Sequence, residues 1–385
     1  MAKILVTSAS HILSDFLLTS EGTHCYGLFK FLRKYGYEFI ALSPYIRLHE
    51  GLDNVEFYQV GTFRLSPTSS SLHEFVFHVE FLTRGFIKTR RLLRKEKIDV
   101  VHHMLPAVFN YTFSPLAILE NHLKQPFIFG PVSSHYFERP MNEKMLLPLT
   151  SRLHKKTIQK SDRIVAISDQ VRNLYSRLID QAKISVIPFG IDVEMFRPAK
   201  QNPKHDQLSL LYAGSLYPLK GVPCLIQAVA EAEEYGLRIK LNIAGEGAQK
   251  PELAALTRKL GIEKDVIFLG AVPYADMPRL YQDCDVYCFP TLGEPFGKAM
   301  IEAMACGKPV IASRIGGPTE VIQNGVNGIL VPPGNVEELA EEIVLLENDE
   351  NARRRIGEKA RETILKRFSW KVVADKYHLL YSEFV

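Results

Sequence analysis

Short apolar runs rich in β-branched residues alternate along the whole chain with longer amphipathic stretches. The first run, Ile4-Leu5-Val6, is apolar at every position, which is typical of a strand covered on both faces of its sheet. The longer stretches repeat their apolar residues with the helical period, as in residues 23–35 and 223–235. Strands and helices that alternate in this way predict βαβ units and parallel sheets.

The expected strands form two series separated by a polar linker. The linker, from Arg197 to Asp206, is rich in Pro, Lys and Asn and has no apolar period. The first series is expected at residues 3–7, 38–43, 98–104, 126–131, 163–168 and 184–188. The second is expected at residues 208–214, 239–245, 266–270, 286–290, 309–313 and 328–331. Further helices are expected at residues 249–260 and 298–305.

Length and composition agree with two domains. A chain of 385 residues exceeds one domain of roughly 100–200 residues. With 46% hydrophobic and 23% charged residues, each half can bury its own core. We predict an α/β protein with two Rossmann-like, doubly wound domains, residues 1–195 and 205–369, which face each other across a cleft. Parallel sheets bind ligands beyond the carboxyl ends of their strands, so the cleft suits a transfer between two ligands. The last helix, within residues 370–385, could pack on either domain.

Charge is mild overall but clustered. The net charge is +4, and the basic residues gather in two runs: Arg84, Lys88, Arg90, Arg91, Arg94, Lys95 and Lys97, then Lys155, Lys156, Lys160 and Arg163. One interpretation is a solvated helix face. The other is contact with anionic lipid or with a phosphate-bearing acceptor. We expect no nucleic-acid partner, because no recognisable nucleic-acid-binding module is present.

Cysteine usage and hydropathy predict a cytoplasmic protein. Five scattered cysteines fit neither a disulfide framework nor a zinc site, so we expect buried thiols. No apolar run reaches the roughly 18 residues of a membrane span, and the N-terminal apolar stretch is too short for a signal peptide. The basic runs leave peripheral contact with the inner membrane face open.

The segment from residue 289 to 303 combines a strand end at Pro290, a Gly/Pro turn carrying Glu294 and a helix that starts near Gly297. Backbone N–H groups at a helix start are unpaired, and with the helix dipole they form an anion site suited to a diphosphate. Glu294 on one side and Glu302 on the other would accept hydrogen bonds from sugar and ribose hydroxyls. A surface turn followed by a solvent-facing helical glutamate is the alternative.

Two further loops follow expected strands at the same edge. The loop after Gly214 opens a helix and places Lys220 as a point charge for the phosphates of a leaving nucleotide. An ordinary turn lysine is the alternative. The loop that begins at Gly245 starts like a dinucleotide fingerprint, but Lys250 stands where its third glycine would be. We therefore expect Gly245 to form a close backbone turn at the cleft rim rather than an NAD site.

Together, these segments resemble the retaining glycosyltransferases with the GT-B fold, family 4 (glycosyl transferases group 1). The signature of that family is two glutamates with seven residues between them, which Glu294 and Glu302 match. Other segments that match are residues 161–168, 187–192, 303–313, 316–320 and 327–331. The resemblance spans nearly the whole chain and is strongest from residue 160 onward.

The resemblance implies a role for each matching residue. Glu294 would bind hydroxyls of the donor sugar, Glu302 the nucleotide ribose and Lys220 the diphosphate. The last helix, 370–385, would cross back onto the N-terminal, acceptor-binding domain. The other donor-site positions that it implies are Gly22, Gly214, Ser215, Gly245, Val272 beside the base, and the backbone N–H groups of Phe296, Gly297 and Lys298.

Two loops depart from the family pattern. Ser215 stands where the family usually has Arg, so neutralisation of phosphate charge would rest on Lys220 and the helix N-terminus. The N-terminal Gly-Gly loop of the family appears as Glu21-Gly22, in which Gly22 keeps the close backbone approach.

The family often carries a histidine in the cleft, and three histidines are candidates for it here. They are His135 and, at the end of an expected strand, His102 and His103. A structural hydrogen-bonding role is the alternative for each. The Asp283-Cys284-Asp285 sequence matches an Asp-x-Asp metal motif of other transferases, but it starts a strand, away from the ligand edge. We therefore expect no metal and no cofactor beyond the nucleotide-sugar donor.

The residues and the resemblance together lead us to expect a metal-independent retaining glycosyltransferase. Its expected donor is a nucleoside-diphosphate sugar, with UDP-glucose as the first choice. Its expected acceptor is a hydroxyl of a glycan or lipid-linked molecule in polysaccharide or glycolipid synthesis. The alternatives are a nucleotide-sugar epimerase and a non-catalytic nucleotide-sugar-binding subunit. A pyridoxal-dependent phosphorylase would need a lysine motif that we do not find.

Overall fold

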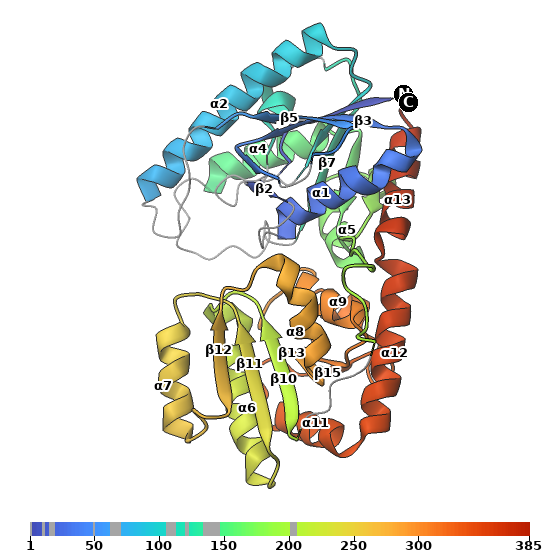
Figure 1. The fold of residues 1–385 in the computed structure, drawn as a ribbon. Coiled ribbons are helices and arrows are strands. Elements are labelled where there is room, and N and C mark those ends of the chain that lie inside the picture. The colour runs from blue at the N-terminus through green and yellow to red at the C-terminus, as the bar shows by residue number, and fades with distance from the viewer. Residues whose placement is uncertain are drawn as a thin grey trace. The chain divides into compact units, whose positions relative to one another are not determined.

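The chain folds into two compact units, each built around a parallel sheet (Figure 1). The first unit comprises Met1–Gly190 with Trp370–Val385, and the second comprises Ile191–Ser369. The computed structural model describes residues 2–9, 12–14, 20–48, 51–61, 71–104, 113–119, 123–133, 147–200 and 206–385. The predicted α/β fold class with two parallel-sheet domains is confirmed.

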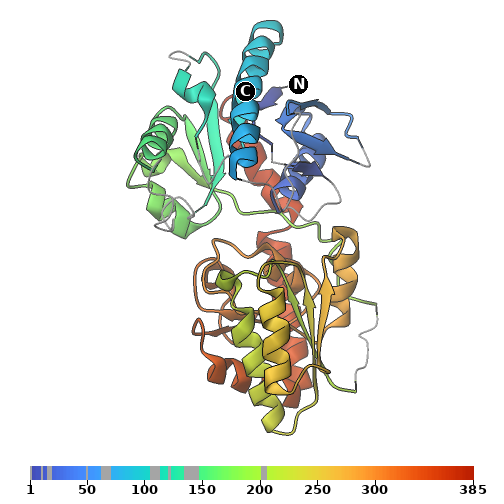
Figure 2. The ribbon, with the colours of Figure 1, turned by 90° about the vertical axis from the view of Figure 1, so that its left-hand side faces the viewer.

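The first unit has a seven-stranded sheet with the order β5-β3-β1-β6-β7-β8-β9. Figures 1 and 2 show helices on both faces of it. Helices α1 (Ser20–Leu32) and α13 (Trp370–Ser382) cover one face with their apolar side chains, and α2, α3 and α4 lie over the other. Its strands are β1 (Lys3–Val6), β3 (Glu38–Ser43), β5 (Val55–Gln59), β6 (Val100–His103), β7 (Phe127–Val132), β8 (Arg163–Ala166) and β9 (Ile184–Val186). Its other elements are β2 (Ile12–Ser14), β4 (Tyr45–Arg47), α2 (Ser71–Lys95), α3 (Pro115–Leu119), α4 (Leu147–Gln159) and α5 (Asp169–Tyr175).

Strand β5 and the small β2–β4 pair are absent from the predicted series. Strand β5 lies at the edge of the sheet, has no fully buried residue, and includes two exposed polar residues, Glu56 and Gln59, among its five. An edge strand is covered by neighbours on one side only, so it lacks the continuous apolar run that revealed the inner strands.

The second unit has a six-stranded parallel sheet with the order β12-β11-β10-β13-β14-β15. Helices α6, α7 and α11 pack on one face and α8, α9 and α12 on the other (Figures 1 and 2). All six strands lie where the sequence predicts them: β10 (Leu208–Ala213), β11 (Ile239–Ala244), β12 (Val266–Gly270), β13 (Val286–Phe289), β14 (Val310–Ser313) and β15 (Ile329–Val331). The helices are α6 (Val222–Glu234), α7 (Lys250–Leu260), α8 (Met277–Asp283), α9 (Lys298–Ala305), α10 (Pro318–Val321), α11 (Val336–Asn348) and α12 (Glu350–Arg367).

Both sheets reverse their strand order beside the first strand of the unit, between β1 and β6 and between β10 and β13. At such a switch point the two loops leave toward opposite faces, and open α/β sheets bind their ligands there. The loops after β10 and β13, which carry Lys220 and Glu294, therefore meet at the ligand-binding edge of the second unit.

The chain returns to the first unit at Trp370, the single tryptophan of the protein. Its indole stacks on the rings of His24 and Phe31 from α1, with centroids 5.1 Å and 5.7 Å away. A Cβ atom added to Gly27 or Gly190 would lie 2.4 Å or 2.5 Å from the indole. The indole thus fills a site that only two glycines leave open, and it fixes the start of α13 on α1.

Replacing Gly27 by Ala tests this packing. The added methyl group overlaps an indole that neighbouring rings hold, and this outweighs the gain of about 1 kcal/mol in helix propensity. We expect a net loss of about 1–2 kcal/mol in the unfolding free energy of the first unit, measured by urea denaturation with Trp370 fluorescence. Gly51→Ala, whose Cβ would meet nothing within 4 Å, is the matched control. Equal stability of the two variants would contradict this packing.

Candidate functional site

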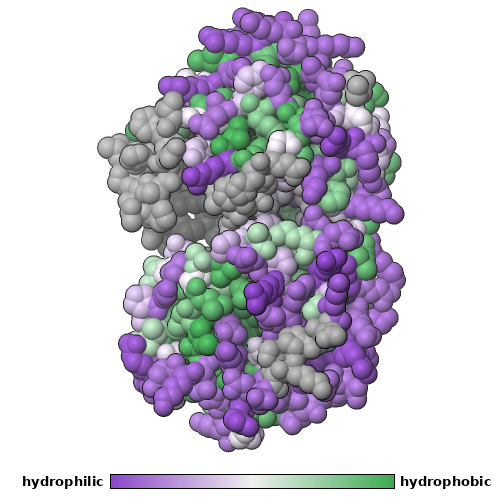
Figure 3. All heavy atoms as spheres, viewed as in Figure 1, coloured by the Kyte–Doolittle hydropathy of each residue, from purple (hydrophilic) through white to green (hydrophobic). Residues whose placement is uncertain are grey.

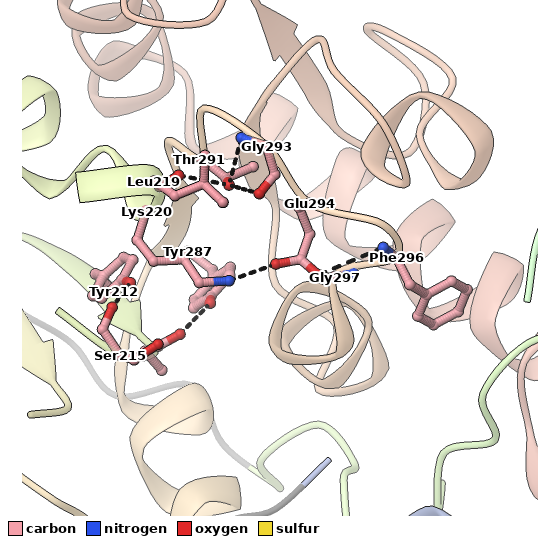
Figure 4. A network of polar contacts seen from close by, with 11 residues as sticks. Tyr212, Ser215, Leu219, Lys220, Tyr287, Thr291, Gly293, Glu294, Phe296 and Gly297 are labelled. Atoms are coloured by element: carbon pink, nitrogen blue, oxygen red, sulfur yellow. Dashed lines mark hydrogen bonds and ion pairs between the residues drawn. The ribbon is translucent and has the colours of Figure 1, made fainter. Parts of the chain in front are cut away.

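Lys220 and Glu294 form an ion pair that joins the loops after β10 and β13 (Figure 4). Lys220 ends the short helix η5 (Pro218–Lys220), and Glu294 lies in the turn before α9. The Lys220 Nζ atom is 2.6 Å from Oε2 of Glu294, and the side chains are only 26% and 16% exposed. Partial burial weakens the screening of this pair by water, so the attraction between the two charges is stronger than in a solvated pair.

The same carboxylate also lies at the N-terminus of α9. Its Oε1 atom accepts a hydrogen bond of 3.2 Å from the backbone N–H of Gly297 and is 3.5 Å from the nitrogen of Phe296. Gly297 has a φ of 92°, a left-handed conformation that other residues rarely adopt. Glu294 therefore occupies, with its own negative charge, the helix-end anion site that the sequence predicts for a diphosphate.

Close backbone contacts hold the two loops together. The backbone N–H of Leu292 donates a hydrogen bond of 2.8 Å to the carbonyl oxygen of Leu219, and Thr291 Oγ1 lies 3.2 Å from the same oxygen. A Cβ atom on Gly316 would lie 2.2 Å from the carbonyl oxygen of Glu294, so a glycine is needed where this third loop supports the turn. The position of the Glu294 carboxylate is thus fixed from several sides.

Gly214, Ser215 and Gly245 line the edge beside Lys220. A Cβ atom on Gly245 would lie 1.8 Å from the carbonyl oxygen of Gly214, so the loops after β10 and β11 touch through bare backbone. Ser215 is exposed, and its carbonyl accepts a hydrogen bond of 2.9 Å from the Tyr212 hydroxyl. With Ser215 uncharged, Lys220 supplies the positive charge of this loop.

Glu302 lies within α9 and is 3% exposed. The hydroxyl of Tyr274 donates a hydrogen bond of 3.0 Å to its Oε1 atom, and the hydroxyl of Tyr281 donates one of 3.0 Å to its Oε2 atom. The Nζ atom of Lys298 is 3.9 Å from Oε1. Burial raises the pKa of Glu302, and Lys298 and the two tyrosine hydroxyls oppose this rise. Burial likewise lowers the pKa of Lys298, which Glu302 opposes.

Val272, the predicted base-lining residue, is partly exposed in the loop just before Tyr274.

Sequence reasoning missed Tyr274 and Tyr281. The sequence offers one signal for them: a buried tyrosine needs a hydrogen-bond partner for its hydroxyl, and both recur with Met277 at the spacing of one buried helix face. Only the fold shows that their common partner is Glu302, 28 and 21 residues further along the chain.

The Asp283-Cys284-Asp285 sequence lies at the beginning of β13, at the opposite end of that strand from Glu294. Asp285 accepts a hydrogen bond of 2.8 Å from the backbone N–H of Ser209, and Asp283 lies 3.7 Å from Arg279. Within the described ranges, no group of three or more His, Cys, Asp or Glu residues is placed to hold a metal ion. The five cysteines are free thiols, four of them buried.

The switch point of the first unit carries Thr7 and His103. Thr7 Oγ1 is 2.7 Å from Nδ1 of His103, and burial lowers the pKa of this histidine to about 3. Both residues line a cavity of about 20 Å³ together with Ser114, whose buried hydroxyl finds no hydrogen-bond partner among the described residues. A cavity of this size has room for about one water molecule. Gly22 is buried near the start of α1, which follows β1.

His102 points to the opposite face of β6 and is fully buried. Its Nδ1 atom is 2.8 Å from the Tyr381 hydroxyl, and its Nε2 atom is 3.0 Å from the carbonyl oxygen of Gly130. The Nε2–H group therefore donates to Gly130, and Nδ1 accepts from Tyr381. One ring nitrogen thus anchors α13 and the other bonds to β7, which is the structural alternative for this histidine. His135 lies outside the described residues.

Comparison with known families agrees with this arrangement. The family model "Glycosyl transferases group 1" matches residues 194–363, and "Glycosyltransferase Family 4" matches residues 22–195. Together, the two models cover both units. The protein belongs to the group 1 glycosyltransferases with the GT-B fold.

Two curated relatives illustrate the range of the family. A D-inositol 3-phosphate glycosyltransferase of Kribbella flavida is 31% identical over 239 residues, which are 57% of this chain and 56% of the relative. The chain thus spans little more than half of that relative. An uncharacterized glycosyltransferase of Methanocaldococcus jannaschii is 27% identical over 92% of this chain and 91% of its own length.

Solved structures with the same fold cover the whole chain. A sucrose-phosphate synthase from Thermosynechococcus elongatus has a TM-score of 0.78 at 20% identity, and 99% of it is covered. Anabaena HepE in complex with UDP-glucose has a TM-score of 0.72 at 20% identity, and 100% of it is covered. None of the helices that the structure describes has the length and apolar content of a membrane span.

The contacts of Glu294 predict that its carboxylate competes with other anions. Glu294→Gln keeps the size of the side chain and removes its charge, which frees Lys220 and the α9 N-terminus for another anion. We expect this variant to bind inorganic pyrophosphate about tenfold more tightly than the unsubstituted protein, measured by calorimetry. Glu246→Gln removes a comparable partner of Lys250, 2.7 Å away, and should change nothing. Unchanged or weaker pyrophosphate binding by Glu294→Gln would rule out the competition.

Burial of His102 and His103 predicts an acid-sensitive first unit. Both pKa values fall from the ordinary 6.5 to about 3 on folding. The unfolded chain therefore binds more protons, and stability that is present above pH 6.5 is lost as the pH falls toward 3. At pH 5 each histidine costs about 2 kcal/mol relative to neutral pH. The unfolding free energy, measured by urea denaturation, should fall between pH 7 and pH 5 by about half as much in His102→Gln as in the unsubstituted protein. An undiminished difference would exclude His102 as a source.

Proposed function

We propose that this protein transfers a hexosyl group from a nucleoside-diphosphate sugar to an acceptor hydroxyl and retains the anomeric configuration. The observation that carries the proposal is the meeting of Lys220, Glu294 and the α9 N-terminus at the switch point of the second unit. This combination places positive potential suited to a diphosphate beside a carboxylate suited to sugar hydroxyls.

In the proposed reaction, the donor diphosphate replaces the Glu294 carboxylate on Lys220 and on the N–H groups at the start of α9. Glu294 then accepts hydrogen bonds from hydroxyls of the sugar. The bond between the anomeric carbon and the diphosphate oxygen breaks with its electron pair going to that oxygen. The acceptor oxygen bonds to the same face of the sugar, and its proton passes to the leaving diphosphate. Lys220 and the α9 amides stabilise the charge that develops on the leaving group.

We propose UDP-glucose as the donor and no metal ion as cofactor. The choice of donor is supported by Anabaena HepE, a structure of the same fold that was solved with UDP-glucose. The cationic Lys220 and the helix dipole can stabilise a leaving diphosphate without a divalent cation. Glu302 would bind the ribose, and Val272 would lie against the base.

We assign acceptor binding to the first unit, with a glycan or lipid-linked acceptor. Helix α2 supports a charged partner, because Arg84, Arg90, Arg91 and Arg94 lie on the same exposed face as the half-exposed Val79 and Ile87. Figure 3 shows the hydrophilic end of this helix at the surface. A basic face with interspersed aliphatic side chains suits peripheral contact with anionic lipid at the inner membrane face.

Release of UDP from UDP-glucose tests the proposed function, with UDP-galactose, UDP-N-acetylglucosamine and GDP-mannose as competing donors. Lys220→Ala and Glu294→Ala should each lower kcat/KM about 100-fold or more, because each removes charge that acts on the transition state. Lys250→Ala, another loop-side lysine of the second unit, should leave the rate unchanged. The activity should persist in excess EDTA.

Four outcomes would contradict the proposal. Undiminished turnover in both variants would remove the site assignment. A strict need for Mn²⁺ would return attention to Asp283 and Asp285. Formation of UDP-galactose from UDP-glucose without UDP release, followed by NMR, would identify an epimerase instead. Nucleotide-sugar binding without any turnover would identify a binding subunit.

A further inference from the structure

We propose that Tyr274 and Tyr281 are positioning residues that hold Glu302 as a receptor for the vicinal hydroxyls of ribose, and that they thereby make the site selective for ribonucleotides. The inference deepens the proposed function and rests on it. It assigns a positioning role to two residues that lie outside the glutamate signature and the phosphate-binding loops.

The two hydroxyls grip the carboxylate from separate elements. Tyr274 opens the short helix η6 (Tyr274–Asp276), and Tyr281 lies in α8. Each hydroxyl donates a hydrogen bond of 3.0 Å to a different oxygen of Glu302. Both rings also pack against Phe196, with centroid distances of 5.4 Å and 5.9 Å. Because the rings cannot swing freely, the plane of the carboxylate is fixed.

The chemistry of the contacts sets the direction of each hydrogen bond. An ionised carboxylate only accepts, so both tyrosines must donate. Burial raises the pKa of Tyr281 well above its ordinary value, so its hydroxyl stays protonated. A carboxylate has about four acceptor positions, and the tyrosines use one on each oxygen. One further position on each oxygen matches the two neighbouring hydroxyls of a ribose.

The position of Glu302 along α9 fits this ligand. The α9 N-terminus at Gly297 is the proposed diphosphate site, and Glu302 lies five residues further on, about one and a half helical turns. On the other side, Tyr274 follows two residues after Val272, the residue proposed to lie against the base. The order of base, ribose and diphosphate in a nucleotide therefore corresponds to Val272, Glu302 and Gly297.

Because Glu302 is buried, its protonation depends on the two tyrosine hydroxyls. A carboxylate that is 3% exposed has little water to solvate it, and its remaining ionic partner, Lys298, is 3.9 Å away. Loss of a tyrosine hydroxyl removes one of the contacts that hold the pKa of Glu302 down. The carboxyl group would then protonate at a higher pH and would lose an acceptor position.

The test compares the binding of UDP, 2′-deoxy-UDP and 3′-deoxy-UDP by calorimetry. In the unsubstituted protein, loss of either ribose hydroxyl should weaken binding about tenfold or more, because it leaves a buried charged acceptor unpaired. In Tyr281→Phe and Tyr274→Phe, this ratio should fall at least threefold. Tyr381→Phe removes a buried tyrosine hydroxyl bond from His102 in the first unit, and it should leave the ratio unchanged.

Two further measurements separate positioning from general loss of structure. In the Glu302→Gln background, Tyr281→Phe should lower the ratio no further, since both changes act through one carboxylate. The acid limb of UDP binding against pH should move to higher pH in Tyr281→Phe, with thermal unfolding confirming a folded protein.

The outcomes distinguish this inference from the proposed function. A ratio that stays at its unsubstituted value in both tyrosine variants overturns the positioning role and leaves the proposed function standing. A ratio near one in the unsubstituted protein overturns the ribose assignment of Glu302 and this inference with it. Failure of both UDP and GDP to bind the unsubstituted protein overturns the proposed function itself.

Discussion

The second unit is organised around one negative charge, the carboxylate of Glu294. It compensates the cation of Lys220 at 2.6 Å and the N–H group of Gly297 at 3.2 Å, so it joins the loops of two neighbouring strands to a helix end. Positive potential gathered in this way stabilises an anion of either origin. Under the proposed function, the same contacts that stabilise the ligand-free protein mark where a diphosphate would bind, and its binding would exchange one anion for another.

That exchange depends on the topology of the sheet. Strand order reverses between β10 and β13, and only this pair of neighbours sends its loops to opposite faces from adjacent strand ends. The first unit has the same reversal between β1 and β6, but Thr7 and His103 meet there without a charged side chain in their contact. The low pKa of the buried His103 keeps it neutral. Equivalent topology thus carries anion chemistry in one unit and neutral polar chemistry in the other.

The sequence predicts those features that are local. Continuous apolar runs gave the inner strands, and a Gly/Pro turn before a helix placed Glu294 and its anion site. Contacts over long separations could not be read in this way. The partner of His102 is Tyr381, 279 residues away, and that pairing explains a histidine that the sequence left open between a catalytic and a structural role. Strand β5 was not predicted because the exposed Glu56 and Gln59 interrupt its short apolar run at a sheet edge.

Glu302 is the clearest case in which stability and function diverge. A charge buried to 3% exposure is costly even when it is paired, and well-packed apolar residues often replace buried ion pairs without loss of stability. Folding alone therefore gives little reason for a carboxylate, Lys298 and two tyrosine hydroxyls to share the base of α9. A ligand that brings two hydroxyls to the same carboxylate supplies such a reason, because it completes the hydrogen bonding that the protein leaves unfinished.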